Sequence, residues 1–83
     1  MPNLSEDIAE LVETLVRPLV EFPDDLVVTS SMDGDTVLVD VQVNESDAGK
    51  VIGRQGRVIK SIRTLARAAA SRSDAHVEVE LID

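Results

Sequence analysis

The sequence predicts an α+β fold in which a three-stranded sheet carries helices on one face, in the order α-β-β-α-α-β. Two segments place apolar residues at helical spacing, and others alternate apolar and polar residues as strands do. Because each strand has one apolar side, helices are needed on that side only, which gives two layers. With 83 residues, we expect one domain, residues 1–83, with a small core.

Residues 4–16 are expected to form the first helix. Its apolar residues recur at three- and four-residue intervals, and they are Ile8, Leu11, Val12, Leu15, Val16 and Leu19. Asn3 is placed to cap the start of this helix. Pro18 should end or kink it near Arg17, and residues 22–25 form a connecting turn.

Strands are expected at residues 26–32, 36–43 and 76–82. The second alternates strictly, with Val37, Val39, Val41 and Val43 on one side, and the third places Val77, Val79 and Leu81 on one side. The stretch Asp33-Gly34-Asp35 predicts a hairpin between the first two strands, with a short bulged loop.

A short helix is expected from Ser46 to Ile52 and a longer one from Gly56 to about Arg72. At 100° per residue, the longer helix gathers apolar residues on one side, namely Val58, Ile59, Ile62, Leu65, Ala66 and Ala69. Its opposite side is basic and consists of Arg57, Lys60, Arg63 and Arg67. We expect the apolar side to pack on the sheet.

The most informative segment runs from Lys50 to Ile59, where Gly53 and Gly56 bracket Arg54 and Gln55. Glycine permits positive φ and close backbone approach, so this pair suits a tight joint between two helices. The N–H groups that open the second helix then point outward, and the helix dipole favours a negative charge there. A phosphate group is the expected ligand.

The net charge of −8 is distributed unevenly along the chain. Seven of the eight basic residues lie between positions 50 and 72, where no acid occurs, so this window carries +7 and the remainder −15. Because an electric field depends on local arrangement, a basic face on an acidic body still attracts a polyanion. We expect a modest affinity for nucleic acid.

Several function classes find no support in the sequence. Phe22 is the only aromatic residue, so the stacking platforms of RRM and OB-fold proteins cannot be built. A single His76 and the lack of cysteine argue against a metal site and a disulfide scaffold. Phosphate-binding patterns of the Walker A and dinucleotide kinds are missing. Asp40, Glu78 and Glu80 share an open sheet face without a cleft, so we expect neither an enzyme nor a cofactor.

The chain is expected to be cytoplasmic. Its apolar runs are a few residues long and its first residues are acidic, so no membrane insertion, signal peptide or transit peptide is predicted. The absence of cysteine agrees with a reducing compartment.

The segment Val51–Ile59 resembles the signature of KH domains, in which isoleucine, glycine, two residues and glycine precede another aliphatic residue. The element order is similar to the bacterial, type II arrangement of the KH fold, and this resemblance covers the whole chain. The flanking stretches, residues 47–50 and 60–65, are similar to those of the KhpA family of small bacterial single-KH-domain proteins.

This resemblance implies a non-catalytic protein that binds single-stranded RNA, with about four nucleotides clamped across the glycine loop. The loop would hold the sugar–phosphate backbone, cations would flank it, and bases would lie over an aliphatic groove. Carried over by position, the RNA-binding residues are Lys50, Val51, Ile52, Gly53, Arg54, Gln55, Gly56, Arg57, Ile59 and Lys60.

The resemblance also implies a homodimer, or a heterodimer with a larger RNA-binding protein of the KhpB (Jag/EloR) type. A post-transcriptional regulator or RNA chaperone, with effects on cell-envelope growth and cell shape, is the implied role. One alternative remains open: a protein-interaction module that keeps the KH fold without significant RNA binding, which the high acidity favours. Simpler interpretations of the two features also remain open: the glycine pair is a joint between helices that binds no ligand, and the basic side of the longer helix is a solvated surface.

Overall fold

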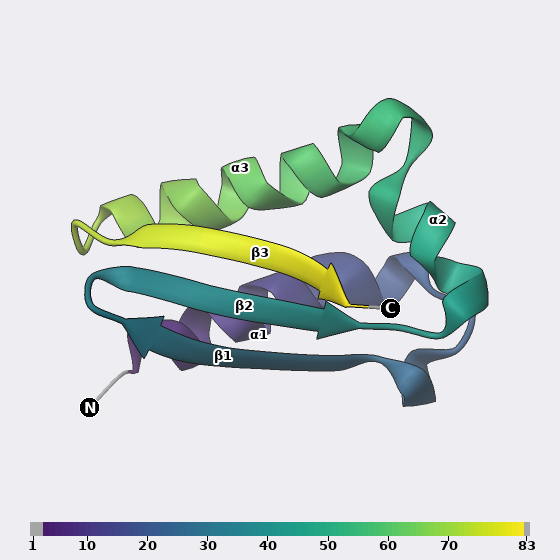
Figure 1. Cartoon of the computed structure of the whole chain (residues 1–83), viewed down its shortest axis with the longest axis horizontal. Coiled ribbons are helices and arrows are strands. Elements are labelled where there is room, and N and C mark those ends of the chain that lie inside the picture. The colour runs from purple at the N-terminus through teal and green to yellow at the C-terminus, as the bar shows by residue number, and fades with distance from the viewer. Residues whose placement is uncertain (1–2, 83) are drawn as a thin grey trace.

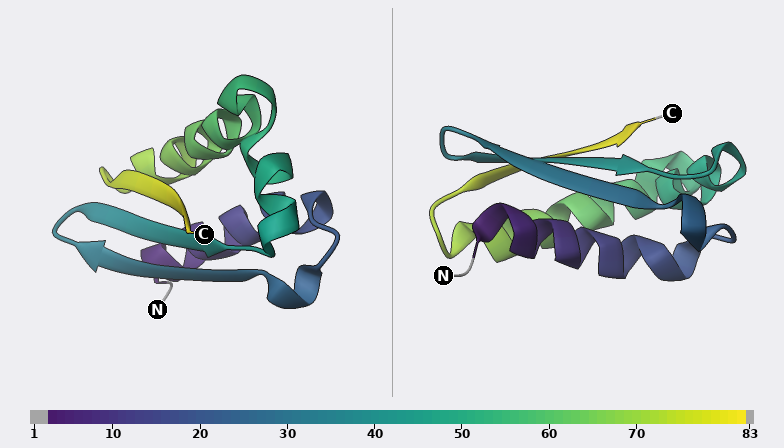
Figure 2. Two further views of the ribbon diagram at one scale, coloured as in Figure 1. Left: turned by 45° about the vertical axis from the view of Figure 1, so that its right-hand side comes forward. Right: turned by 90° about the horizontal axis from the view of Figure 1, so that it is seen from below.

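The structure is a computed structural model that describes residues 3–82, and its element order is the predicted one (Figure 1). The helices are α1 (Leu4–Val16), α2 (Ala48–Ile52) and α3 (Arg57–Ser71), and the strands are β1 (Val27–Asp33), β2 (Thr36–Gln42) and β3 (His76–Ile82). Short 3-10 turns lie in the connections, at Arg17–Leu19, Pro23–Asp25, Glu45–Asp47 and Arg54–Gly56. Figure 2 shows α1 and α3 on one face of the sheet, which confirms the two-layer α+β prediction.

The sheet is mixed and has the order β1-β2-β3. The central strand β2 runs antiparallel to β1 and parallel to β3. Its valines Val37, Val39 and Val41 are fully buried beneath the helices, as their alternation predicts. Each such buried side chain contributes about 1.5–3 kcal/mol relative to an exposed one.

The hairpin between β1 and β2 is tighter than the expected bulged loop. Asp33 pairs directly with Thr36, so only Gly34 and Asp35 form the turn. Gly34 has a φ of +62°, which a two-residue turn with glycine at its first position requires. The prediction of a bulge is therefore wrong, because the two strands pair residue by residue up to the turn and neither strand has an extra, unpaired residue.

Two amphipathic helices cover the inner face of the sheet. Side chains buried in this layer come from α1 (Ile8, Val12, Val16) and from α3 (Ile59, Ile62, Ala66, Ala70). Asn3 caps α1 as predicted, since its Oδ1 accepts hydrogen bonds from the backbone N–H groups of Ser5 at 3.0 Å and Glu6 at 3.4 Å. Within the described residues, no helix combines the length and apolarity that crossing a bilayer requires.

Leu65 departs from the predicted core of α3. Its side chain is 49% exposed, although the helical spacing predicts that it lies on the apolar side of this helix. The buried side of α3 is centred on Ala66, and neighbouring positions on a helix differ by about 100°. Leu65 therefore lies on the flank of α3 that neither α1 nor the sheet covers.

Candidate functional site

The loop from Gly53 to Gly56 joins α2 to α3 in a backbone conformation that depends on glycine. Gly53 has φ 76° and ψ 174°, and Gly56 has φ 74° and ψ 15°. A Cβ atom at position 53 would also lie 2.8 Å from the Cβ of Val58 and 3.0 Å from its backbone nitrogen. Gly53 is thus required both by its conformation and by the close approach of α3. Gln55, with φ 58°, is a non-glycine residue in the left-handed region.

This loop presents free backbone donors. The N–H of Gly53 donates to the carbonyl of Gly49 at 2.9 Å, and the N–H of Gly56 donates to the carbonyl of Gly53 at 3.1 Å. The N–H groups of Arg54 and Gln55 donate to no other described residue. The helix α3 follows without a side-chain cap or an acidic residue in its first turn. An anion at this corner would meet both free donors and the positive end of α3.

Three cations occur in the loop and in the first turn of α3. Arg54, Arg57 and Lys60 are exposed, and none of them forms an ion pair with another described residue. Arg57 Nη2 donates to Oε1 of Gln55 at 3.1 Å, which orders two side chains of the loop region. The site therefore has unneutralised positive charge beside its backbone donors.

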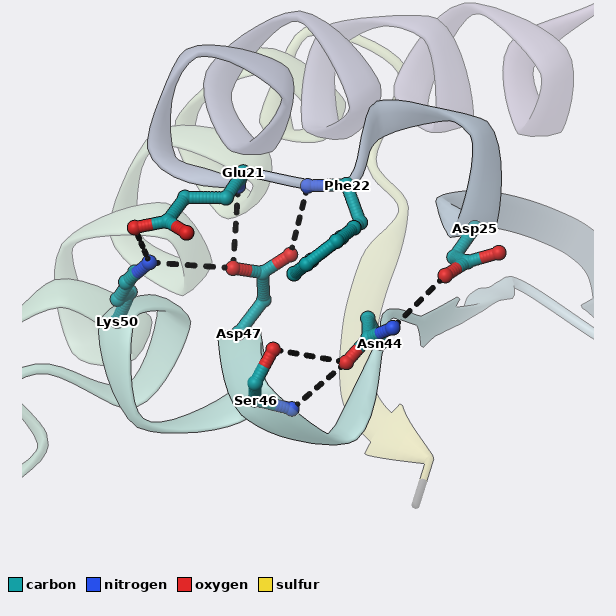
Figure 3. A network of polar contacts seen from close by, with 7 residues as sticks. All are labelled: Glu21, Phe22, Asp25, Asn44, Ser46, Asp47 and Lys50. Carbon is teal, nitrogen blue, oxygen red and sulfur yellow. Dashed lines mark hydrogen bonds and ion pairs between the residues drawn. The ribbon is translucent and has the colours of Figure 1, made fainter.

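Lys50, in contrast, is engaged within the protein (Figure 3). Its Nζ lies 2.7 Å from Oε1 of Glu21 and 3.3 Å from Oδ1 of Asp47. The hydrogen bond with Glu21 raises the pKa of Lys50 above its ordinary value, partial burial opposes this, and Asp47 adds to the increase. A phosphate group could use this ammonium only by competing with two carboxylates.

The predicted aliphatic residues differ in accessibility. Ile52 is 41% exposed at the end of α2, whereas Ile59 is 7% exposed and Val51 is fully buried. Val51 lies on the inner side of α2 and belongs to the hydrophobic core. The structure therefore leaves Ile52 as the residue of this set with substantial surface for a base, and it gives Val51 a packing role.

The residues on the basic side of α3 differ in their contacts with the rest of the protein. Arg63 is partly buried, and its Nε donates to the carbonyl oxygen of Val79 in β3 at 3.2 Å. Lys60 and Arg67 are exposed. Arg63 therefore fastens α3 to the sheet, while its neighbours leave their charges in solvent.

Asp47 positions the loop, and the sequence did not reveal this role. Its side chain is fully buried, and it accepts hydrogen bonds from the backbone N–H groups of Glu21 at 3.0 Å and Phe22 at 3.1 Å (Figure 3). Burial raises the pKa of Asp47, but these two bonds and Lys50 together lower it below its ordinary value. An aspartate before a short helix is typically a helix cap, and a partner about 25 residues away in sequence leaves no local pattern.

A second set of hydrogen bonds fastens the same two segments. Nδ2 of Asn44 donates to Oδ2 of Asp25 at 2.9 Å, while Oδ1 of Asn44 accepts from the backbone N–H of Ser46 at 2.9 Å (Figure 3). The chain after α1 is thereby fixed to the segment that begins α2. Since α2 leads directly into the glycine loop, this network sets the position of the loop on the core.

The variant Asp47→Asn should lower the melting temperature by about 10 °C at neutral pH, because an amide oxygen cannot accept both backbone bonds as well as the lysine. A carboxylate whose folded pKa is lowered stabilises the protein above its unfolded pKa, and that stability is lost as pH falls through the folded value. The difference between the wild type and the variant should thus shrink below about pH 4, near the ordinary value of 3.8. Thermal unfolding followed by circular dichroism across pH measures this difference.

Asp24→Asn is the matched control for this prediction. Asp24 is exposed in the neighbouring 3-10 turn and its side chain makes no hydrogen bond to another described residue. The control should melt with the wild type at every pH. Equal effects of the two substitutions would contradict the role given to Asp47.

Comparison with known proteins gives one family. A family model for the KH domain of KhpA/KhpB matches residues 9–81. The chain is 39% identical to the RNA-binding protein KhpA of Listeria monocytogenes over 89% of its own length and 97% of that relative. It is 41% identical to the protein of this name from Clostridium perfringens over 88% of its length and 97% of the relative. It is 38% identical to the protein of this name from Bacillus subtilis over 94% of its length and 96% of the relative.

A likeness to a solved structure concerns the fold. A crystal structure of an Era variant from Aquifex aeolicus, bound to GDP and aluminium fluoride, superposes with a TM-score of 0.70 and 24% identity. The match covers 98% of this chain and 31% of that longer protein. The helix–strand–strand–helix–helix–strand arrangement is therefore shared with part of a much larger chain.

Proposed function

Because the chain belongs to the family of KhpA/KhpB KH domains, a non-catalytic family, we propose that it binds single-stranded RNA at the loop from Gly53 to Gly56. One observation carries the proposal: the backbone N–H groups of Arg54 and Gln55 have no partner among the described residues, and they belong to two exposed residues of a loop whose cations form no ion pair there. The names of the curated relatives support RNA as the ligand.

In this proposal the loop holds the RNA backbone. One phosphate accepts hydrogen bonds from the free N–H groups of Arg54 and Gln55, where the dipole of α3 also favours negative charge. Arg57 and Lys60 neutralise neighbouring phosphates, and Ile52 offers its exposed side chain to a base. With a single aromatic residue in the sequence, contacts of bases with aliphatic side chains replace stacking.

The remaining residues of the predicted set act through the loop. Lys50 fastens α2 to Glu21, and Val51 and Ile59 anchor the two helices in the core. Gly53 and Gly56 supply the backbone conformation. Contact with RNA is thus concentrated between the last residue of α2, Ile52, and the first turn of α3.

A contact of about four nucleotides is weak, so we propose that a second RNA-binding site acts together with the first. That site comes from a second copy of the chain or from a larger partner of the KhpB (Jag/EloR) type. Coupling two sites raises avidity by roughly 10²–10⁴ when both can bind at once. The proposed role is cytoplasmic, in post-transcriptional regulation or as an RNA chaperone that influences cell shape.

A protein-interaction module without significant RNA binding is the second candidate. The charge of −15 outside positions 50–72 favours it, because this body repels a polyanion. The two candidates differ in one measurable property: only direct phosphate contact makes RNA affinity depend steeply on salt.

The salt dependence of binding tests the proposed function. For a labelled, unstructured RNA of about eight nucleotides, the slope of log affinity against log salt should be close to −2, or about −0.7 for each of roughly three neutralised phosphates. Arg57→Gln should make this slope shallower by about 0.7. Fluorescence anisotropy between about 50 and 200 mM salt provides the measurement.

Arg72→Gln is the matched control, since Arg72 is exposed beyond the other end of α3. Its slope should equal that of the wild type. A flat salt dependence, or an equal change in both variants, would contradict phosphate binding at the glycine loop.

A further inference from the structure

The two edges of the sheet are not equivalent. At the β3 edge, the carbonyl oxygen of Val79 accepts a hydrogen bond from Nε of Arg63. At the β1 edge, no described residue outside the sheet donates to or accepts from the strand backbone. Strand β1, Val27–Asp33, contains no lysine, arginine or proline, which proteins commonly use to block an edge, and its single charge is its last residue.

The free edge has a defined hydrogen-bonding pattern. In a hairpin closed by a two-residue turn, the closing pair Asp33–Thr36 exchanges its backbone hydrogen bonds within the hairpin. Alternation along β1 then directs the N–H and C=O groups of Val28, Ser30 and Met32 away from β2. These are the groups that an added strand needs.

A groove lies between this edge and α1, and its helical wall is acidic. It is lined by Glu6, Ala9, Glu10 and Glu13 of α1 and by Val28 and Ser30 of β1. Glu6 and Glu10 form no ion pair with another described residue, while Glu13 pairs with Arg17 at 3.0 Å. The helix α1 lies beneath β1 in the right-hand view of Figure 2.

We propose that the β1 edge binds an extended, basic segment of another protein, which adds a fourth strand to the sheet. Backbone hydrogen bonds to Val28, Ser30 and Met32 provide the pairing. Side chains of an added strand alternate between the two faces, so every second residue faces α1. Lysine or arginine at those positions meets Glu6 and Glu10, whereas small Ala9 and Ser30 leave room for their aliphatic stems.

Charge argues against a second copy of this chain as the occupant. Pairing of two β1 edges about a two-fold axis would place the acidic wall of one copy beside that of the other. Both copies also carry a net charge of −8. Since like charges across an interface cost free energy, a basic partner strand is the occupant that the groove favours.

A short peptide can test this proposal directly on the whole protein. The probe is a fluorescent heptapeptide with blocked ends in which lysine and valine alternate, compared with its glutamate–valine counterpart. The lysine peptide should bind and shift the amide signals of Val28, Ser30 and Met32, and the glutamate peptide should not bind. Failure of the lysine peptide to bind at about millimolar concentration, where any useful affinity of this kind would show, overturns the proposal.

Two N-methylated forms of the lysine peptide test strand addition separately from charge. One is methylated at every second amide and the other at the intervening amides, so their charges are the same. Only the form whose free amides face β1 should retain binding, because an added strand directs alternate N–H groups to its neighbour. Equal binding of both forms would overturn strand pairing at this edge.

A pair of double variants tests the acidic wall. Glu6→Gln with Glu10→Gln should weaken binding of the lysine peptide about fivefold, as two lost surface ion pairs predict. Glu78→Gln with Glu80→Gln removes the same charge from exposed positions on β3, across the sheet, and should change binding less than about twofold. Equal losses would show a response to net charge alone and would overturn the site.

The oligomeric state of the wild type and of an edge-strand variant tests whether a second copy occupies the β1 edge. Ser30→Pro removes an outward N–H of the edge strand, a position at which proline is tolerated. If the wild type is a dimer and Ser30→Pro makes it a folded monomer, a second copy occupies this edge and the proposal of a basic partner fails. The proposal predicts that this variant loses the lysine peptide and keeps the oligomeric state of the wild type.

Discussion

Replacing Arg54 and Gln55 together with aspartate is expected to lower the affinity for single-stranded RNA by about 100-fold. The change removes one positive charge and adds two negative charges next to the proposed phosphate position. Each charge at this distance from a phosphate is worth about 1 kcal/mol at a partly exposed site, so three give about 3 kcal/mol. Aspartate tolerates the left-handed conformation of position 55, so the loop backbone can persist. Anisotropy titration of a labelled RNA measures the loss.

A matched double variant separates local from overall charge. Arg67→Asp with Ala68→Asp makes the same change in charge at exposed positions nearer the other end of α3. It should reduce RNA affinity only severalfold, because solvent and salt screen charges beyond about 10 Å. Both variants should melt near the wild type. If they lose the same affinity, the glycine loop has no special role in RNA binding.

Gly53→Ala should destabilise the protein by about 3 kcal/mol or more. The φ of 76° and ψ of 174° at this position belong to a region that is almost restricted to glycine and costs other residues about 1–3 kcal/mol. The added Cβ would in addition lie 2.8 Å from Cβ of Val58 and 3.0 Å from its backbone nitrogen, which forces α3 to shift. Denaturant unfolding gives the free energy difference.

Two other glycines make this prediction specific. The Cβ atom added by Gly56→Ala would meet only Cε of Lys60, at 3.9 Å. The φ of 74° alone should therefore lower the free energy of unfolding, by about 1–2 kcal/mol. Gly49→Ala has open space and no positive φ within α2, and it should be neutral or stabilise by up to about 1 kcal/mol. Equal effects at all three positions would contradict the geometry of the loop.

The local elements could be predicted from the sequence because their causes are local. Apolar spacing set α1 and α3 within a residue or two, and the alternation of Val37, Val39 and Val41 identified the buried face of β2. The positive φ of Gly53 and Gly56 agrees with the expected joint between two helices. The family that the resemblance of the extended run indicated is confirmed by a match over residues 9–81.

What could not be predicted depends on contacts between distant segments. Asp47 binds Glu21 and Phe22, and Lys50 pairs with Glu21, so neither role appears in a local pattern. Val51, expected to contribute to the groove for bases, is fully buried, and Leu65, expected on the apolar side of the longer helix, is 49% exposed. The neighbours of α2 and α3 decide which flank of each helix is covered. Residues that shape the site are therefore read from the tertiary structure, whereas the loop itself is read from the sequence.

A titration of the isotope-labelled protein with a short unstructured oligoribonucleotide tests the central claim most directly. The amide signals of residues 53–57 should move progressively as RNA is added, and those of Thr29 and Ser31 on the outer face of β1 should stay in place. If the signals of residues 53–57 remain unmoved at about millimolar RNA, a concentration that reveals even weak binding, the loop does not hold a phosphate.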